Sequence, residues 1–321
     1  MSTTTPSREV KRLATQMLRL KKSSGTAPYV LVLGADAAPI SLEMLEYNVL
    51  QDAELTEQEI RSYSEGERTD AFEEAWSRLG IDSRFATLDE AFSQAQADLF
   101  YAQKLEGYRG LARLCKEGYF DIVLTTNVDT LLEDALIDIK LMPREWQVFV
   151  NGRENLDKIV QGLKFPTPRL KIVKLHGDLF ARVFAFSHDE VFQFSDQIQS
   201  LLEEYLVRPV LIVGNSMRDQ DINRCIKARG DALYYVNERR PQPGTVIYDA
   251  VRVRKGVVIS GEEAEFGRFF TALSRELLGG DKPEEVGLET LEKVGIDVTQ
   301  ISDEQSDKPL IELLSDSTVV F

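Results

Sequence analysis

The stretch Phe120-Asp-Ile-Val-Leu-Thr-Thr-Asn-Val-Asp129 places two polar side chains directly after a short apolar run. The segment 120–125 is short, rich in β-forming residues and followed by polar residues, as expected of a strand. In open α/β sheets, ligands bind beyond the carboxyl ends of the strands. Asn127 and Asp129 are therefore candidate ligand-binding residues. Both are also good N-cap residues for a helix predicted over 131–137, so helix capping is an equally open interpretation.

Similar apolar runs lie on both sides of this stretch. They cover residues 29–33, 170–175, 209–213, 233–236 and 257–259. Residues 189–207 and 219–229 have apolar side chains at helical spacing. Because strands that alternate with helices are typical of parallel sheets, the sequence predicts an α/β fold. We expect a doubly wound, mostly parallel, Rossmann-like sheet.

The remaining segments predict a domain over about residues 28–280, with an N-terminal lead-in, a helical insertion and a C-terminal extension. Residues 10–22 have the spacing of an amphipathic helix, within a lead-in of residues 1–27. Residues 42–116 are helical in pattern and predict a helical insertion. From residue 281 to residue 321, eleven Asp or Glu residues stand against three Lys residues. Such a composition is typical of a loosely attached acidic C-terminal tail, which either docks on a partner or stays disordered.

Composition excludes several classes of function. The net charge of −15 argues against direct nucleic-acid binding, which needs clustered Lys and Arg. With only two cysteines, Cys115 and Cys225, the chain cannot build a four-thiolate zinc site, and we expect no metal and a cytoplasmic location. No run of about 18 apolar residues predicts a membrane span. No signal-peptide core is expected at the N-terminus either.

Two further polar motifs follow predicted strands. Gly34-Ala35-Asp36-Ala37-Ala38 stands where a glycine-rich loop would face a pyrophosphate, although a simple turn between a strand and a helix explains it as well. Lys174-Leu-His176-Gly-Asp178 places one of the two histidines of the chain at a strand end. Histidine is the usual proton-transfer group near neutral pH, and a structural role is the alternative. The other histidine, His188, precedes a predicted helix and is interpreted as structural.

Taken in order, these motifs resemble those of the sirtuin superfamily, particularly its bacterial sirtuin-like domains. The resemblance rests on Gly-Ala at the first strand, Thr-Asn-x-Asp at a middle strand and His-Gly at a later one. It extends to a Gly-x-Ser turn and to an Asn after a strand, and it covers about residues 28–278. It implies catalytic roles for Asn127, Asp129 and His176. It implies cofactor-binding roles for Gly34, Ala35, Asp36, Thr126, Gly214, Ser216 and Asn237.

The resemblance also implies an activity. Because the zinc-binding cysteines of sirtuin deacetylases are absent, it indicates an NAD glycohydrolase that cleaves NAD, as substrate, to nicotinamide and ADP-ribose. Sirtuin-like domains of this kind act in bacterial antiphage defence, with activation by a signal. The partners implied are NAD or ADP-ribose, and a homo-oligomer or another protein of a defence system. The alternative is a catalytically degenerate sirtuin-like scaffold or assembly subunit that binds NAD weakly or not at all.

The first loop departs from the family pattern, Gly-Ala-Gly-x-Ser. Asp36 replaces the second glycine and Ala38 replaces the serine, and the Gly-x-Pro segment that usually follows is missing. Two like charges about 4 Å apart repel by about 1–4 kcal/mol at dielectric constants between those of water and a protein surface. The lost hydroxyl removes a hydrogen bond worth about 1 kcal/mol. The sequence therefore predicts weakened NAD binding at this loop.

Overall fold

The computed structural model describes residues 6–24, 29–96, 99–186, 196–215 and 220–279. Residues 1–278 form one compact unit, and the acidic tail predicted for 281–321 lies outside the described residues. At the centre of this unit is a seven-stranded sheet in the order β3-β4-β2-β1-β7-β8-β9, in which every pair is parallel. The predicted doubly wound, mostly parallel sheet is confirmed.

The strands form where short apolar runs allow burial on both faces. They are β1 (Tyr29–Leu33), β2 (Phe120–Thr125), β3 (Trp146–Val150), β4 (Leu170–Lys174), β7 (Val210–Val213), β8 (Leu233–Val236) and β9 (Val257–Ile259). All five residues of β1 are buried, as expected of a central parallel strand. A separate antiparallel hairpin joins β5 (Gly177–Asp178) to β6 (Val183–Phe184).

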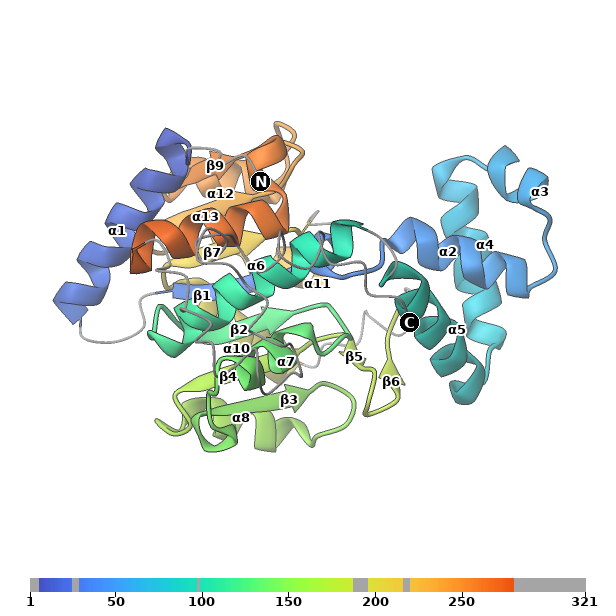
Figure 1. Cartoon of the computed structure of the whole chain (residues 1–321), viewed down its shortest axis with the longest axis horizontal. Coiled ribbons are helices and arrows are strands. Elements are labelled where there is room, and N and C mark those ends of the chain that lie inside the picture. The colour runs from blue at the N-terminus through green and yellow to red at the C-terminus, as the bar shows by residue number, and fades with distance from the viewer. Residues whose placement is uncertain (1–5, 25–28, 97–98, 187–195, 216–219, 280–321) are drawn as a thin grey trace, which may run out of the picture. The chain divides into compact units, whose positions relative to one another are not determined.

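Helices cover both faces of the sheet. Tyr29, Leu31 and Leu33 point into one core with the helices α1 (Arg8–Ser24), α6 (Leu99–Lys116), α7 (Leu131–Asp138) and α13 (Phe266–Leu278). Val30 and Val32 point into the other core with α8 (Leu156–Lys164), α10 (Asp196–Leu206), α11 (Gln220–Cys225) and α12 (Val246–Val253). On the first face, α13 packs against both α1 and α6, as Figure 1 shows. The result is a three-layer α/β/α domain.

A third core belongs to the predicted helical insertion. It joins α2 (Leu42–Asp52), α4 (Glu65–Arg78) and α5 (Ile81–Ala95) through side chains such as Val49, Trp76 and Leu88. The short helix α3 (Glu57–Ser62) and α4 both begin with a capping box, at Thr56 and Ser64. Phe184 of the β5–β6 hairpin packs into this core, which anchors the hairpin. Within 42–116, only α6 belongs to the core on the sheet.

Candidate functional site

The sheet brings the predicted site segments to one edge. Leu33 pairs with Thr125 and with Val213, Thr125 pairs with Lys174, and Val213 pairs with Val236, so five strands end in register. The loops that follow lie side by side in the order β4, β2, β1, β7, β8. They carry His176, Asn127 with Asp129, Gly34, Gly214 and Asn237. Thr126, also a predicted site residue, donates its backbone N–H to the carbonyl oxygen of Leu33, at 3.2 Å.

Two glycines allow the loops after β1 and β7 to touch. The backbone N–H of Asp36 donates to the carbonyl oxygen of Gly214, at 2.9 Å. A Cβ on Gly34 would lie 2.3 Å from the Cα atom of Asn215, which no side chain can occupy. Gly214 has a φ of +65°, a conformation that favours glycine. The close approach of the two loops therefore requires a glycine at the first position after β1, whether or not this loop binds a phosphate.

Asp36 contacts a residue predicted to hold the cofactor. The Nδ2 group of Asn237 donates to Oδ2 of Asp36 at 2.8 Å, and the backbone N–H of Arg239 donates to Oδ1 of Asn237 at 2.9 Å. Asn237 is 4% exposed, and both polar atoms of its side-chain amide form hydrogen bonds. Ala35, beside Asp36, is exposed. Asp36, which departs from the family pattern, thus forms a hydrogen bond that joins the loop after β1 to the loop after β8.

Helix α6 reaches over the same loop with two donors. Lys104 donates through Nζ to the carbonyl oxygen of Ala38, and the Tyr108 hydroxyl donates to that of Ala37 at 3.2 Å. Burial lowers the pKa of Lys104, and the nearby carboxylates of residues that include Asp36 and Asp129 oppose that shift. Sequence reasoning missed Lys104, because a lysine on an amphipathic helix gives no sign of the carboxylates that it faces.

Asn127 and Asp129 are buried with unused hydrogen-bonding capacity. They are 7% and 6% exposed. Within the part of the chain that the structure describes, Nδ2 of Asn127 and Oδ2 of Asp129 have no partner that meets the geometry of a hydrogen bond, although Asn127 is near enough to the Tyr108 hydroxyl to lower the pKa of that group. The other oxygen of Asp129, Oδ1, accepts from the backbone N–H of Leu131 at 3.0 Å, at the start of α7. Neither Asn127 nor Asp129 is the N-cap residue of α7, which is Thr130, but one oxygen of Asp129 accepts from the first N–H of the helix.

Burial also changes the acidity of Asp129. It raises the pKa of the carboxyl group, while the Leu131 N–H and the Lys174 ammonium group act in the opposite direction. A buried polar atom without a partner is uncommon and calls for an explanation such as a bound ligand. Two such atoms lie two positions apart in one loop, beyond the end of a central strand, which makes this loop the candidate ligand-binding loop.

His176 lies at the junction between β4 and the β5–β6 hairpin, and it is half-buried. Its carbonyl oxygen accepts from the backbone N–H of Ala185, at 2.9 Å. The next residue, Gly177, has a φ of +105°, which lets the chain turn from the sheet into the hairpin. Two other residues of the sequence analysis, Ser216 and His188, lie outside the described residues.

Replacing Gly177 with alanine is expected to destabilise the domain by at least about 2 kcal/mol. The added Cβ would lie 1.9 Å from the carbonyl oxygen of Val183, and φ would be strained in addition. Urea denaturation measures the effect. Gly66→Ala is the control, because a Cβ there meets nothing within 4 Å and alanine favours helix α4 by about 0.5–1 kcal/mol. Equal stability of the two variants would contradict the tight turn.

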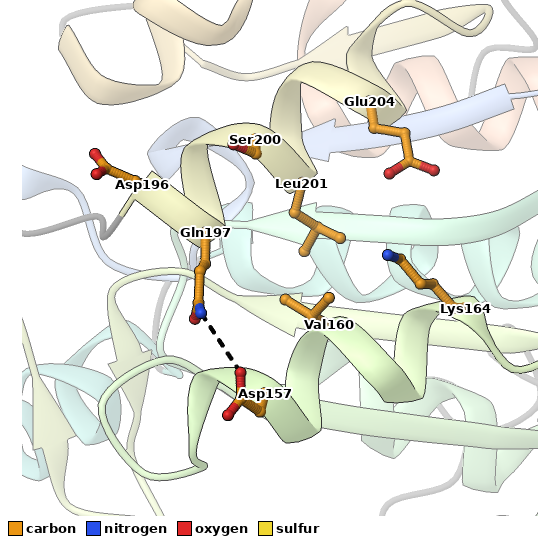
Figure 2. Close-up of a pocket in the computed structure, with 8 residues that line it drawn as sticks. All are labelled: Asp157, Val160, Lys164, Asp196, Gln197, Ser200, Leu201 and Glu204. Carbon is orange, nitrogen blue, oxygen red and sulfur yellow. Dashed lines mark hydrogen bonds between the residues drawn. The ribbon is translucent and has the colours of Figure 1, made fainter.

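A groove on the surface of the domain lies elsewhere. It has a volume of about 320 Å³, is lined by residues of α8 and α10, and contains a hydrogen bond from Gln197 to Asp157 at 3.5 Å (Figure 2). Its charged lining residues are Asp157, Asp196 and Glu204, which are acidic, and Lys164, which is basic. None of its lining residues is one of the predicted site residues.

The two cysteines are buried free thiols, and burial raises the pKa of the Cys115 thiol far above its ordinary range. A buried thiol with a raised pKa is typical of a structural cysteine. In the described ranges, no group of three or more His, Cys, Asp or Glu side chains could hold a metal ion. Among the helices that the structure describes, none combines the length and the apolar character that a membrane span requires.

Comparison with solved structures finds similarity to enzymes of the Sir2 class. A structure described as the basis for the mechanism and regulation of Sir2 enzymes is 15% identical, with a TM-score of 0.39 over 85% of this chain and 100% of the other. A mutant Sir2 homologue in complex with 2′-O-acetyl ADP ribose is 12% identical, with a TM-score of 0.38 over 85% and 99%. A putative LOR/SDH protein from Methanococcus maripaludis S2 is 11% identical, with a TM-score of 0.37 over 87% and 71%.

Comparison with curated proteins found no match. Residues 121–248 match the profile of the SIR2-like domain family. This match includes Asn127, Asp129, His176, Gly214 and Asn237, and it begins after the loop that carries Asp36. Residues 121–248 are therefore similar to the SIR2-like domain family.

Proposed function

We propose that the protein is an NAD glycohydrolase, which cleaves NAD to nicotinamide and ADP-ribose. The observation that carries this proposal is the pair of buried, unpartnered atoms at the edge of the sheet, Nδ2 of Asn127 and Oδ2 of Asp129. In the proposed reaction they orient the nicotinamide ribose, and His176 acts as general base towards a ribose hydroxyl or a water molecule. One of the similar structures, a Sir2 homologue, is bound to an ADP-ribose derivative, which supports a ligand of this class.

The chemistry fits the environment of these residues. Cleavage of the glycosidic bond builds up positive charge on the ribose, and an ordered, water-poor site lowers the barrier by holding the ribose and the nucleophile together. A buried carboxylate close to the ribose would stabilise that charge. The hydrogen bond from the backbone N–H of Leu131 supports this role of Asp129, because it fixes the orientation of the carboxylate.

Release of nicotinamide from NAD tests the proposal directly. The purified chain is assayed alone and in each assembly state that it forms, and Asn127→Ala is expected to reduce turnover by about a hundredfold, because the ribose loses its orientation. Asn48→Ala is the matched control, since that amide lies on α2 and donates to Gln94. An Asn127→Ala protein with the turnover of the wild type would count against the proposal.

A second candidate is a sirtuin-like subunit that does not cleave NAD. The hydrogen bond between Asn237 and Asp36 favours it, because this contact uses the amide and the loop predicted to hold the cofactor. In that case no assembly state releases nicotinamide, and calorimetric titration with NAD and ADP-ribose gives no heat of binding.

The biological setting follows the same proposal. A role in bacterial antiphage defence, a defence-system partner or homo-oligomer and a cytoplasmic location all stay predictions from the sequence. Size-exclusion chromatography of a chain ended near residue 280 tests whether the acidic tail mediates assembly. An unchanged oligomeric state would remove that role from the tail.

A further inference from the structure

A buried lysine lies beneath the candidate site and takes no part in the proposed chemistry. Lys174 is the last residue of β4, and its side chain is 1% exposed. Burying an ammonium group is costly unless all of its donors are used. Nζ has three donors, and the structure gives them three oxygen partners.

These partners come from three different segments. Nζ lies 2.7 Å from the main-chain carbonyl oxygen of Asp129, 2.5 Å from Oδ2 of Asp178 and 2.7 Å from Oε1 of Glu133. The first belongs to the loop after β2, the second to the hairpin that follows His176, and the third to α7. One ammonium group therefore contacts both loops that carry the proposed catalytic residues.

The hairpin partner, Asp178, is itself fixed. Oδ1 of Asp178 accepts from the backbone N–H of Ala181 at 2.8 Å, within the hairpin. The backbone N–H of Leu179 donates to the carbonyl oxygen of Val128 at 2.9 Å, which is a second direct contact between the two loops. The loops thus form one unit in which Lys174 is the only charged link to the backbone of Asp129 among the described contacts.

We propose that Lys174 is a positioning residue that ties the loop of Asn127 and Asp129 to the loop of His176. It sets the distance between the groups that orient the ribose and the group that moves the proton, and its charge helps to keep Asp129 ionised. This inference rests on the proposed function for its catalytic consequence, whereas the tie between the loops stands on the contacts alone.

The electrostatics of the cluster support this role. Burial lowers the pKa of Lys174, but the carboxylates of Glu133 and Asp178 outweigh burial and raise it above the ordinary value, so the side chain stays charged. The Lys174 charge in turn lowers the pKa of Asp129, against the larger effect of burial. The other groups that face Asp129 are Glu133 on α7 and Tyr101, Lys104 and Tyr108 on α6.

These signs predict opposite shifts for two variants. Without the charge of Lys174, the pKa of Asp129 rises. As the pH is lowered, activity that needs the ionised carboxylate is therefore lost at a higher pH than in the wild type. Without the charge of Glu133, Asp129 loses a neighbouring negative charge, and the positive charge of Lys174 is less neutralised. Both effects lower the pKa of Asp129. Lys174→Met is therefore expected to move the acid limb of the pH–rate profile up, and Glu133→Gln is expected to move it down.

The first experiment measures NAD cleavage. Lys174→Met is expected to lower kcat by about a hundredfold, the order of loss that misplaced catalytic groups cause, with a smaller change in KM. Lys171→Met is the matched control, because Lys171 is a buried lysine on the same strand, three residues before Lys174. A Lys174→Met enzyme with the kcat and the acid limb of the wild type would overturn the proposal.

The second experiment needs no substrate. Hydrogen–deuterium exchange of the full chain is expected to speed up in both loops, residues 126–131 and 177–182, for Lys174→Met and in neither for Lys171→Met. If exchange in both loops matches that of the wild type, the tie is absent. If the wild type cleaves no NAD, the proposed function fails, and the exchange result still decides the tie.

Two milder variants cover the case in which Lys174→Met does not fold. Glu133→Gln and Asp178→Asn keep the shape of each side chain and remove one charge. Asp178→Asn is expected to speed exchange in 177–182 more than in 126–131, because it weakens one side of the tie. Unchanged exchange in 177–182 for Asp178→Asn, together with an unmoved acid limb for Glu133→Gln, would also overturn the proposal.

Discussion

Replacing Asp36 with glycine is expected to strengthen NAD binding by about 5- to 1000-fold, which corresponds to relief of about 1–4 kcal/mol of repulsion between like charges. The change removes a carboxylate from the loop where a pyrophosphate would lie. It also releases the Asn237 amide from its hydrogen bond with Asp36. Lys104 lies near Asp36 and already neutralises part of its charge, which places the gain towards the lower end of this range. Calorimetric titration with NAD and with ADP-ribose measures it.

Asp36→Asn separates the effect of charge from that of space. It keeps the shape of the side chain and an oxygen that can accept from Asn237. If charge is the obstacle, Asp36→Asn recovers most of the gain seen with glycine, and if the side chain itself blocks the loop, only glycine does. If neither variant binds NAD more tightly than the wild type, Asp36 is not the residue that weakens NAD binding.

Replacing His176 with alanine is expected to lower nicotinamide release by about 10²- to 10⁴-fold, the usual contribution of a positioned general base. The loss belongs in kcat, with NAD affinity nearly unchanged, because His176 follows β4 whereas the proposed phosphate loop follows β1. Steady-state kinetics over a range of NAD concentrations separates the two. The experiment uses the assembly state in which the wild type is active.

His188→Ala is the control for this prediction, since it removes the other histidine of the chain. Equal losses for both variants would point to a general effect on the protein. If nicotinamide release is unaffected by His176→Ala, then His176 is no general base, and Asp129 becomes the alternative general base to test.

The strands of the sheet could be predicted closely, because buried parallel strands need apolar residues on both faces. β1, β2, β8 and β9 begin and end at the predicted residues. β3 was missed: it pairs only with β4, at the edge of the sheet, and three of its five residues are not buried. Because its exposed positions carry polar residues, β3 lacks the continuous apolar run that marks a central strand.

The candidate site was predictable only where its chemistry follows a strand. Asn127, Asp129 and His176 stand directly after apolar runs, and their placement at one edge follows from the parallel sheet. Lys174 could not be recognised, because its partners come from other segments and give a lysine at the end of a strand no distinctive pattern. The contact between Asp36 and Asn237 joins residues 201 positions apart, which no local pattern can reveal.

The order of the strands divides the edge of the sheet into two halves around β1. The side of β2 and β4 carries Asn127, Asp129 and His176, whereas the side of β7 and β8 carries Gly214 and Asn237. Each side comes from one continuous stretch of the sequence, and the two sides share the cores on both faces of the sheet. Under the proposed function, one side would anchor the ligand and the other would act on it, so a change of ligand would not require a change of chemistry. Asp36, at the boundary, is the position where such a change of ligand would first show.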